Sequence, residues 1–167
     1  MIRDVLHFPD RRLKTPADPV GEFTPEIRSL IDDLVETTAA TAHTVGLAAP
    51  QLGEMWRVCV VDCSGHKRVP DAQGLLVLVN PVVIESEGAE IGREGCLSLP
   101  NITANVRRAK TIAVRALDAE GNERIVRASA FEARAILHEI DHLDGILILD
   151  RVASLTLDVF ARKQRRS

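Results

Sequence analysis

The chain has 167 residues, with 21 Lys and Arg residues against 24 Asp and Glu residues, so its formal net charge is −3. This length and a 46% share of hydrophobic residues predict a single domain over residues 1–167 with one ordinary core. A dedicated nucleic-acid-binding protein would be clearly basic, and the longest apolar run, Leu75–Val79, is far shorter than a membrane span. Three cysteines cannot form a disulfide scaffold, and the N-terminus lacks the apolar stretch of a secretion signal. The composition therefore predicts a cytoplasmic globular protein that binds neither membranes nor specific nucleic-acid sequences.

The first third of the chain predicts an extended segment followed by a helix. Prolines recur through residues 9–25, which favours extended backbone across the surface. Thr24 is a typical N-cap and Pro25 suits the first helical position, so a helix is expected from Pro25 to about Ala42. Its apolar face repeats at helical spacing through Ile27, Leu30, Ile31 and Leu34.

The middle of the chain predicts strands, because short β-branched segments alternate with Gly, Pro and Asn. The expected strands are residues 56–62, 75–81, 99–106 and 111–117, and a turn at Asp118–Asn122 leads into another at 123–129.

A second helix is expected between a capping box, formed by Ser129 and Glu132, and a terminating Gly145. A short strand over residues 146–150 and a last helix from near Ser154 should follow. The order predicts an α+β fold, with antiparallel sheets packed around a central metal-binding helix, an N-terminal helix and a C-terminal helix.

The metal-binding expectation for the central helix comes from the motif His138-Glu139-Ile140-Asp141-His142. Residues four apart on a helix lie about 40° apart around its axis, so both imidazoles can bind one metal ion. Glu139 is offset from them and can contact a metal-bound water without binding the metal. The alternative is a pair of structural histidines on an amphipathic helix.

A catalytic metal site needs a third protein ligand. No histidine follows His142, and His7, His43 and His66 lie in segments that predict loops or surface. Cys59 and Cys63 share one strand face and are expected to be buried hydrophobic residues. Cys96 lies instead between glycines and Pro100, where the backbone can approach a ligand closely, although a lone thiol would more often be structural.

Three segments in this order and spacing, residues 44–51 (TVGLAAPQ), 94–98 (EGCLS) and 138–142 (HEIDH), resemble the signatures of the peptide deformylase family. The resemblance extends over nearly the whole chain. It implies a metal-dependent hydrolase that removes the N-formyl group from the formylmethionine of newly made polypeptides and releases formate.

The resemblance also implies a role for each site residue. Cys96, His138 and His142 would hold one divalent metal, expected to be Fe²⁺ in the cell, with Zn²⁺, Ni²⁺ or Co²⁺ as substitutes. A metal-bound hydroxide would attack the formyl carbon, with Glu139 as general base and then general acid. The Gln51 side chain and the Leu97 backbone N–H would stabilise the oxyanion.

The expected substrate is an extended nascent peptide. The residues expected to line its cleft are Val45, Gly46, Glu94, Gly95 and Leu97. The pocket for the methionine side chain would be formed by Phe131, Arg134 and Ala135, with the Arg134 charge reaching water. Asp141 should flank the site and pair with Arg107 or Arg108.

The sequence departs from the family pattern at Thr44, Leu137 and Thr103, and Thr103 replaces an arginine often found there. The basic C-terminal cluster is interpreted either as a solvated helix end or as a ribosome contact; it comprises Arg162, Lys163, Arg165 and Arg166. Two rival functions stay open at this point: a structural metal site without catalysis, and an amidase for another N-acyl substrate.

Overall fold

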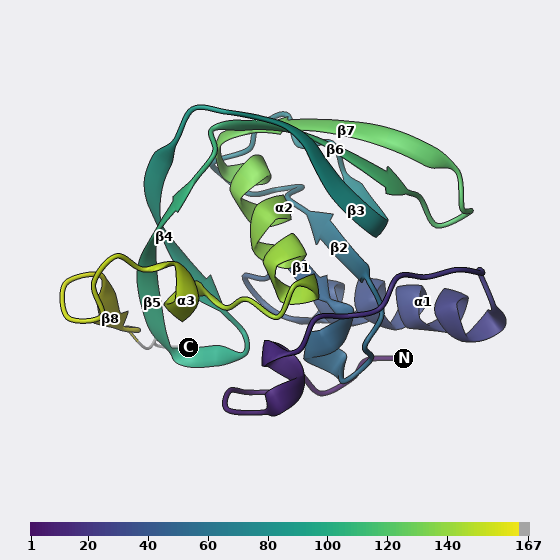
Figure 1. The fold of residues 1–167 in the computed structure, drawn as a ribbon, viewed down its shortest axis with the longest axis horizontal. Helices are drawn as coiled ribbons and strands as arrows, with labels where there is room; N and C mark the ends of the chain where they lie inside the picture. The colour runs from purple at the N-terminus through teal and green to yellow at the C-terminus, as the bar shows by residue number, and fades with distance from the viewer. Residues whose placement is uncertain (164–167) are drawn as a thin grey trace.

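The computed structural model describes residues 1–163 (Figure 1). Its helical elements are η1 (Arg11–Lys14), α1 (Pro25–Ala40), η2 (Ala49–Leu52), α2 (Ala130–Leu143) and α3 (Ile148–Arg151), where η denotes a 3₁₀ helix. Its strands are β1 (Gly46–Ala48), β2 (Val58–Asp62), β3 (Leu75–Glu87), β4 (Glu90–Cys96), β5 (Leu99–Arg108), β6 (Thr111–Leu117), β7 (Glu123–Ser129) and β8 (Val159–Ala161).

The described strands form two antiparallel sheets. The larger sheet has the order β1-β2-β3-β6-β7, and the smaller has the order β4-β5-β8. Figure 1 shows α2 running through the middle of the molecule, with the smaller sheet on one side and the larger on the other. The α+β class is therefore confirmed, and α2 lies between the two sheets.

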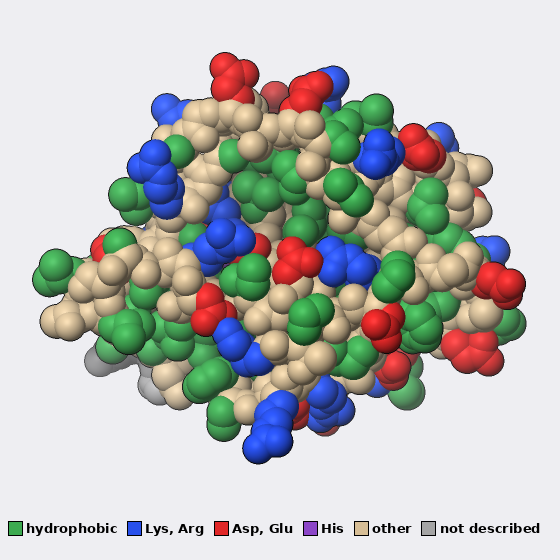
Figure 2. Space-filling view, viewed as in Figure 1, with side chains coloured by type: hydrophobic (Ala, Val, Ile, Leu, Met, Phe, Trp, Pro, Cys, Tyr) green, Lys and Arg blue, Asp and Glu red, His purple; other side chains and the backbone are tan. Residues whose placement is uncertain are grey.

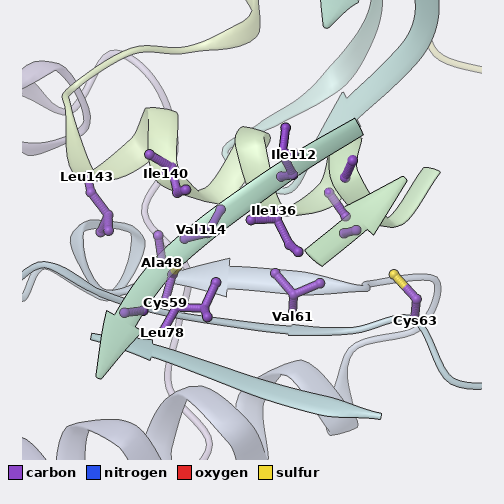
Figure 3. Close-up of a cluster of buried hydrophobic side chains, with 14 residues drawn as sticks. Ala48, Cys59, Val61, Cys63, Leu78, Ile112, Val114, Ile136, Ile140 and Leu143 are labelled. Atoms are coloured by element: carbon purple, nitrogen blue, oxygen red, sulfur yellow. The ribbon is translucent and has the colours of Figure 1, made fainter. Parts of the chain in front are cut away.

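Helices α1 and α2 cover opposite faces of the larger sheet, because side chains alternate along β2. Cys59 and Val61 pack in a cluster with α2, and Val58 and Val60 pack in another with α1. Figure 3 shows the α2 side of this arrangement, with Cys63 in the segment directly after β2. The three cysteines are free and buried, which confirms the expectation that Cys59 and Cys63 are core residues.

Two predicted helix ends agree with the structure. The Thr24 hydroxyl accepts a hydrogen bond from the Ile27 N–H at 3.3 Å, and Pro25 is the first residue of α1. Gly145 follows α2 with a φ of +71°, and a Cβ there would lie 2.7 Å from the Lys14 carbonyl carbon. Both the left-handed backbone and the close approach require glycine at this position.

The predicted capping box at Ser129 is not formed. Ser129 makes no side-chain capping bond, and Ala130 has a φ of +52°. The start of α2 therefore lacks a side-chain N-cap and has a left-handed residue at its first position. Glu132, the other half of the box, accepts hydrogen bonds from the backbone and side-chain nitrogens of Gln73 at 3.2 and 2.7 Å. A tertiary contact therefore replaces the local one.

The chain after α2 also differs from expectation. Residues 146–150 were expected to form a strand but include the start of the short helix α3, and the chain after Ser154 forms a turn and strand β8 instead of a helix. Strand β8 pairs with β5, and residues 164–167 lie outside the described part. Strand β4, for which the sequence predicted no element, pairs with β5 along its length.

Within residues 1–163, no helix is long and apolar enough to cross a membrane. On the face shown in Figure 2, basic and acidic side chains are interspersed, in agreement with the nearly balanced composition.

Candidate active site

Cys96, His138 and His142 converge at the junction of the two sheets. Cys96 ends β4, where the pairing with β5 shifts register, and the two histidines lie one turn apart on α2. One potential ligand atom from each of the three residues lies within 4.8 Å of the other two, and the Cys96 Sγ is 3.3 Å from the His142 Nε2. The sequence motifs are thus brought together as one cluster.

The chemistry of this cluster fits a divalent transition metal. One thiol and two imidazoles are ligands for iron, cobalt, nickel or zinc, and three of them leave a coordination position open. Burial alone would raise the pKa of the Cys96 thiol, but His142 and His138 lower it well below its ordinary value, which favours the thiolate that a metal requires. Cys96 and His142 are also nearly inaccessible to solvent, so a bound ion would be held by protein groups.

Glu94 orients one of the histidines. Its carboxylate lies 2.8 Å from the His138 Nδ1 and accepts bonds from the Arg108 Nε and Nη2 at 2.8 and 2.9 Å. Although burial opposes ionisation, the neighbouring His138 and Arg108 hold the pKa of Glu94 well below its usual range. The carboxylate therefore accepts from the Nδ1–H of His138, which leaves Nε2 free to bind a metal.

Arg134 is buried, contrary to the expectation that its charge reaches water. Its guanidinium donates to the Glu94 carboxylate and to the backbone carbonyls of Val106 and Glu90 at 2.7–2.8 Å. It lies against Gly92, where a Cβ would be 2.8 Å from the Arg134 Cζ. Arg134 still borders the cleft, while its charge ties α2 to β4 and β5.

Asp141 pairs with Arg108, one of its two expected partners, and with Arg151. The Arg108 Nη1 lies 2.6 Å from one carboxylate oxygen, and the Arg151 Nη2 lies 2.7 Å from the other. Arg108 therefore connects Glu94 to Asp141, and all three side chains are at least 90% buried. This network fixes α2 against the smaller sheet.

Glu139 points into the same site and forms no ion pair with a described residue. Its Oε2 is buried and has no hydrogen-bond partner within residues 1–163, and burial raises its pKa. Gly46 lies against its side chain, because a Cβ on Gly46 would be 2.9 Å from the Glu139 Cγ and 3.0 Å from the Val60 carbonyl oxygen. The absence of a side chain at position 46 thus makes room for the carboxylate.

Gln51 is held by η2 with its amide nitrogen toward the cluster. Its Oε1 accepts the Ala48 N–H at 3.0 Å, which orients Nε2 toward the Ser98 hydroxyl at 3.1 Å and the Cys96 Sγ at 3.8 Å. Ser98 is fully buried and had no role in the sequence-based interpretation, although it lies within the EGCLS motif. Leu97, which lies between Cys96 and Ser98 in the chain, borders the cleft.

The cluster opens into a cleft. All the residues expected to contact the peptide line it, namely Val45, Gly46, Glu94, Gly95, Leu97, Phe131, Arg134 and Ala135. His43, His66, Arg93 and Arg162 also line the cleft and were missed. His66 stacks on Phe131 with ring centroids 4.2 Å apart, a contact that no sequence pattern indicated.

Comparisons with known proteins agree with the three motifs. The family model described as polypeptide deformylase matches residues 2–158. A peptide deformylase of Thermodesulfovibrio yellowstonii is 41% identical over 162 residues, covering 97% of this chain and 96% of that protein.

Solved structures give the same result. A crystal structure of a peptide deformylase from Legionella pneumophila has a TM-score of 0.84 at 38% identity, covering 93% of this chain and 88% of that one. A class I type b peptide deformylase from Acinetobacter baumannii, with Met-Ala-Ser bound, has a TM-score of 0.83 at 33% identity, covering 91% of this chain and 99% of that one. The chain thus belongs to the polypeptide deformylase family, metal-dependent enzymes that remove the formyl group from an N-terminal methionine.

Proposed function

We propose that this protein hydrolyses the formyl amide of N-formylmethionyl polypeptides, with Cys96, His138 and His142 holding the metal and Glu139 transferring the proton. The observation that carries the proposal is the Glu139 Oε2 beside the thiol–imidazole cluster, which is buried and has no hydrogen-bond partner among the described residues. A purely structural metal site would close with a fourth protein ligand and would not need this carboxylate.

The peptide would lie extended between the two sheets. Strands β1 and β4 are both terminal in their sheets, so each has an edge that no described strand of its sheet covers. Val45 and Gly46, at the start of β1, and Gly95, in β4, line the same cleft. Backbone hydrogen bonds to such edges bind a peptide without requiring a particular sequence. An enzyme that acts on many different nascent chains needs this kind of binding. The Acinetobacter baumannii relative, solved with Met-Ala-Ser, supports a peptide substrate.

The methionine side chain would enter the part of the cleft beside α2. Phe131 and Ala135 lie one turn apart on this helix, and His66 stacks on the Phe131 ring. These side chains offer a mainly apolar wall of the kind that a thioether can fill. The aliphatic part of Arg134 would complete this wall, because its guanidinium is directed toward Glu94.

Glu139 would perform general base and then general acid catalysis. A divalent ion in the site supplies Lewis acidity and makes water available as a nucleophile at neutral pH. The unpartnered Oε2 can accept a proton from that water, and its raised pKa allows the same atom to donate the proton to the departing amine.

Gln51 and Leu97 would stabilise the negative charge that develops on the formyl oxygen. The Gln51 amide is preoriented by Ala48, so its Nε2–H donors face the cluster before the substrate binds. Removing one donor of this kind typically costs about 10²–10³-fold in kcat.

The cellular metal is proposed to be Fe²⁺, because the thiolate and imidazole donors accept it and the family resemblance implies it. Nascent polypeptides as substrates would place the enzyme in the cytoplasm. Ribosome contact through the basic C-terminus stays a prediction, since Arg165 and Arg166 lie outside the described residues. Deleting residues 161–167 and measuring cosedimentation with ribosomes tests it: unchanged cosedimentation would rule out this contact.

The substrate is tested by following product release from three peptides that differ only at the N-terminus. The metal-loaded enzyme is expected to release formate from formyl-Met-Ala-Ser and to leave acetyl-Met-Ala-Ser and free Met-Ala-Ser intact. An added methyl group in a tight site costs about 10–200-fold. Equal hydrolysis of the acetyl peptide would indicate a general N-acyl amidase, and no release from any peptide would contradict the proposed function.

A further inference from the structure

Strand β8 brings Arg162 to the cleft. In the pairing of β8 with β5, Ala161 faces Ile102 and Phe160 faces Thr103. The Arg162 N–H then donates to the Asn101 carbonyl oxygen at 2.9 Å, so the backbone is held one residue beyond the strand. Arg162, interpreted from the sequence as part of a helix end, therefore lines the cleft that contains Cys96.

The Arg162 guanidinium lies against Gly95, the residue before Cys96. A Cβ on Gly95 would be 2.8 Å from the Arg162 Nη2 and 3.2 Å from its Cζ. The bare backbone of β4 thus allows the positive charge to approach the edge on which the peptide is proposed to bind. Both Gly95 and Arg162 are exposed to solvent, so the guanidinium is available to a ligand.

Arg93 places a second positive charge beside the first. Its Cζ lies 3.6 Å from the centroid of the Phe160 ring, and its Nε donates to the Asn105 Oδ1 at 3.2 Å. Phe160 belongs to β8, so the same strand positions both arginines. The stacking and the hydrogen bond orient Arg93 without neutralising it.

Within residues 1–163, no carboxylate forms an ion pair with either of these two charges. The acidic residues that line the cleft are Glu94 and Glu139, and both are buried. Glu94 is bound by Arg108, Arg134 and His138, and neither Arg93 nor Arg162 forms an ion pair with a described residue. The β4 side of the cleft therefore has two exposed positive charges without acidic partners among the described residues.

We propose that Arg162, together with Arg93, is a specificity residue that favours formylated peptides with an acidic side chain downstream of the methionine. The inference rests on the proposed deformylation and adds a sequence preference to it. An extended peptide on the β4 edge must pass the guanidinium at Gly95, and a carboxylate there would form an exposed ion pair. Such a pair is expected to contribute about two- to fivefold per arginine at low salt, and less when salt screens it.

The test compares kcat/KM for formyl-Met peptide amides that carry Asp or Asn at the second, third or fourth position. At about 0.01 M salt, the parent enzyme should prefer Asp over Asn roughly threefold or more at one of these positions. The Asp-to-Asn ratio of kcat/KM should decline toward one at about 1 M salt, where the Debye length is near 3 Å.

Three variants distinguish charge from structure. Arg162→Gln should reduce the Asp-to-Asn ratio by about two- to fivefold, and Arg162→Lys should restore most of it, because the positive charge returns. Arg115→Gln, which removes an exposed arginine on β6, should retain the parent ratio.

Two results would overturn the inference: no Asp preference in the parent at any position, or a preference that survives in an Arg93→Gln/Arg162→Gln double variant. In both cases, turnover of the Asn peptides shows that deformylation itself stands. If no formyl peptide is hydrolysed at all, the proposed function fails instead.

Discussion

Replacing Glu139 with Gln separates proton transfer from metal binding. The two side chains have nearly the same shape, so the tight contact with Gly46 is kept. The Glu139 Oε2 has no hydrogen-bond partner among the described residues, and burial already disfavours its charged form, so the neutral amide breaks no ion pair. The free energy of unfolding should therefore change by less than about 1 kcal/mol.

The catalytic effect of this change should be far larger. Loss of a general acid and base is expected to lower formate release by about 10²–10⁴-fold, which corresponds to roughly 2.7–5.4 kcal/mol of activation free energy. Metal content should stay at about one ion per chain, as expected for a site with three protein ligands and an open position. Formate release and elemental analysis on the same preparation measure both quantities.

The matched control is Glu132→Gln on the same helix. Glu132 is also buried, but its carboxylate binds Gln73, and it is not among the cleft-lining residues. This variant should retain turnover within about twofold while it loses about 1–3 kcal/mol of stability. If Glu139→Gln turns over formyl peptide near the parent rate, or if it loses its metal, the assigned role of Glu139 is wrong.

Three further changes test the site and its support. Gly46→Ala places a Cβ 2.9 Å from the Glu139 Cγ, so kcat should fall about tenfold or more while metal is retained, and an unchanged kcat would contradict the close approach. Elemental analysis of Cys96→Ala should show that most of the metal is lost, and formate release should be lost as a consequence. Cys59→Ala should keep both and lose only about 1 kcal/mol in urea denaturation, so equal metal loss in the two variants would contradict the ligand assignment. Arg108→Met removes the cation between two buried carboxylates and should cost about 3–5 kcal/mol, or roughly 10 °C in melting temperature; a shift below about 2 °C by calorimetry would show that the network is not stabilising.

Local sequence signals predicted those helix ends that are set by single residues. Thr24 and Pro25 set the start of α1, and Gly145 ends α2, because a hydroxyl acceptor, a fixed φ and a left-handed backbone are properties of single residues. Alternation along β2 likewise predicted that Cys59 and Cys63 are buried, since side-chain direction in a strand has a period of two.

The spacing of the motifs also identified the metal ligands as candidates and indicated the family. The motif spacing did not predict which side chains orient the ligand residues. The Glu94 contact with His138 and the Arg108 link to Asp141 join residues 33–44 positions apart in the chain. The sequence offered Arg107 and Arg108 as partners of Asp141 without choosing between them, and it did not indicate the Glu94–His138 contact, because the buried charges meet only after β4, β5 and α2 have packed.

Tertiary pairing overrode local propensity at three places. Glycines in β4 favour a loop, yet the strand forms because β5 offers it a partner along its whole length. Glu132 binds Gln73 and leaves the capping box unmade. The segment after Ser154 was predicted to be helical, but its residues 159–161 pair with the open edge of β5. Local patterns in the sequence were thus sufficient for the core pattern, the start of α1, the end of α2 and the candidate ligand types. That β8 places Arg162 against Gly95 followed from the tertiary packing, because strand pairing depends on which edges remain free once the sheets have formed.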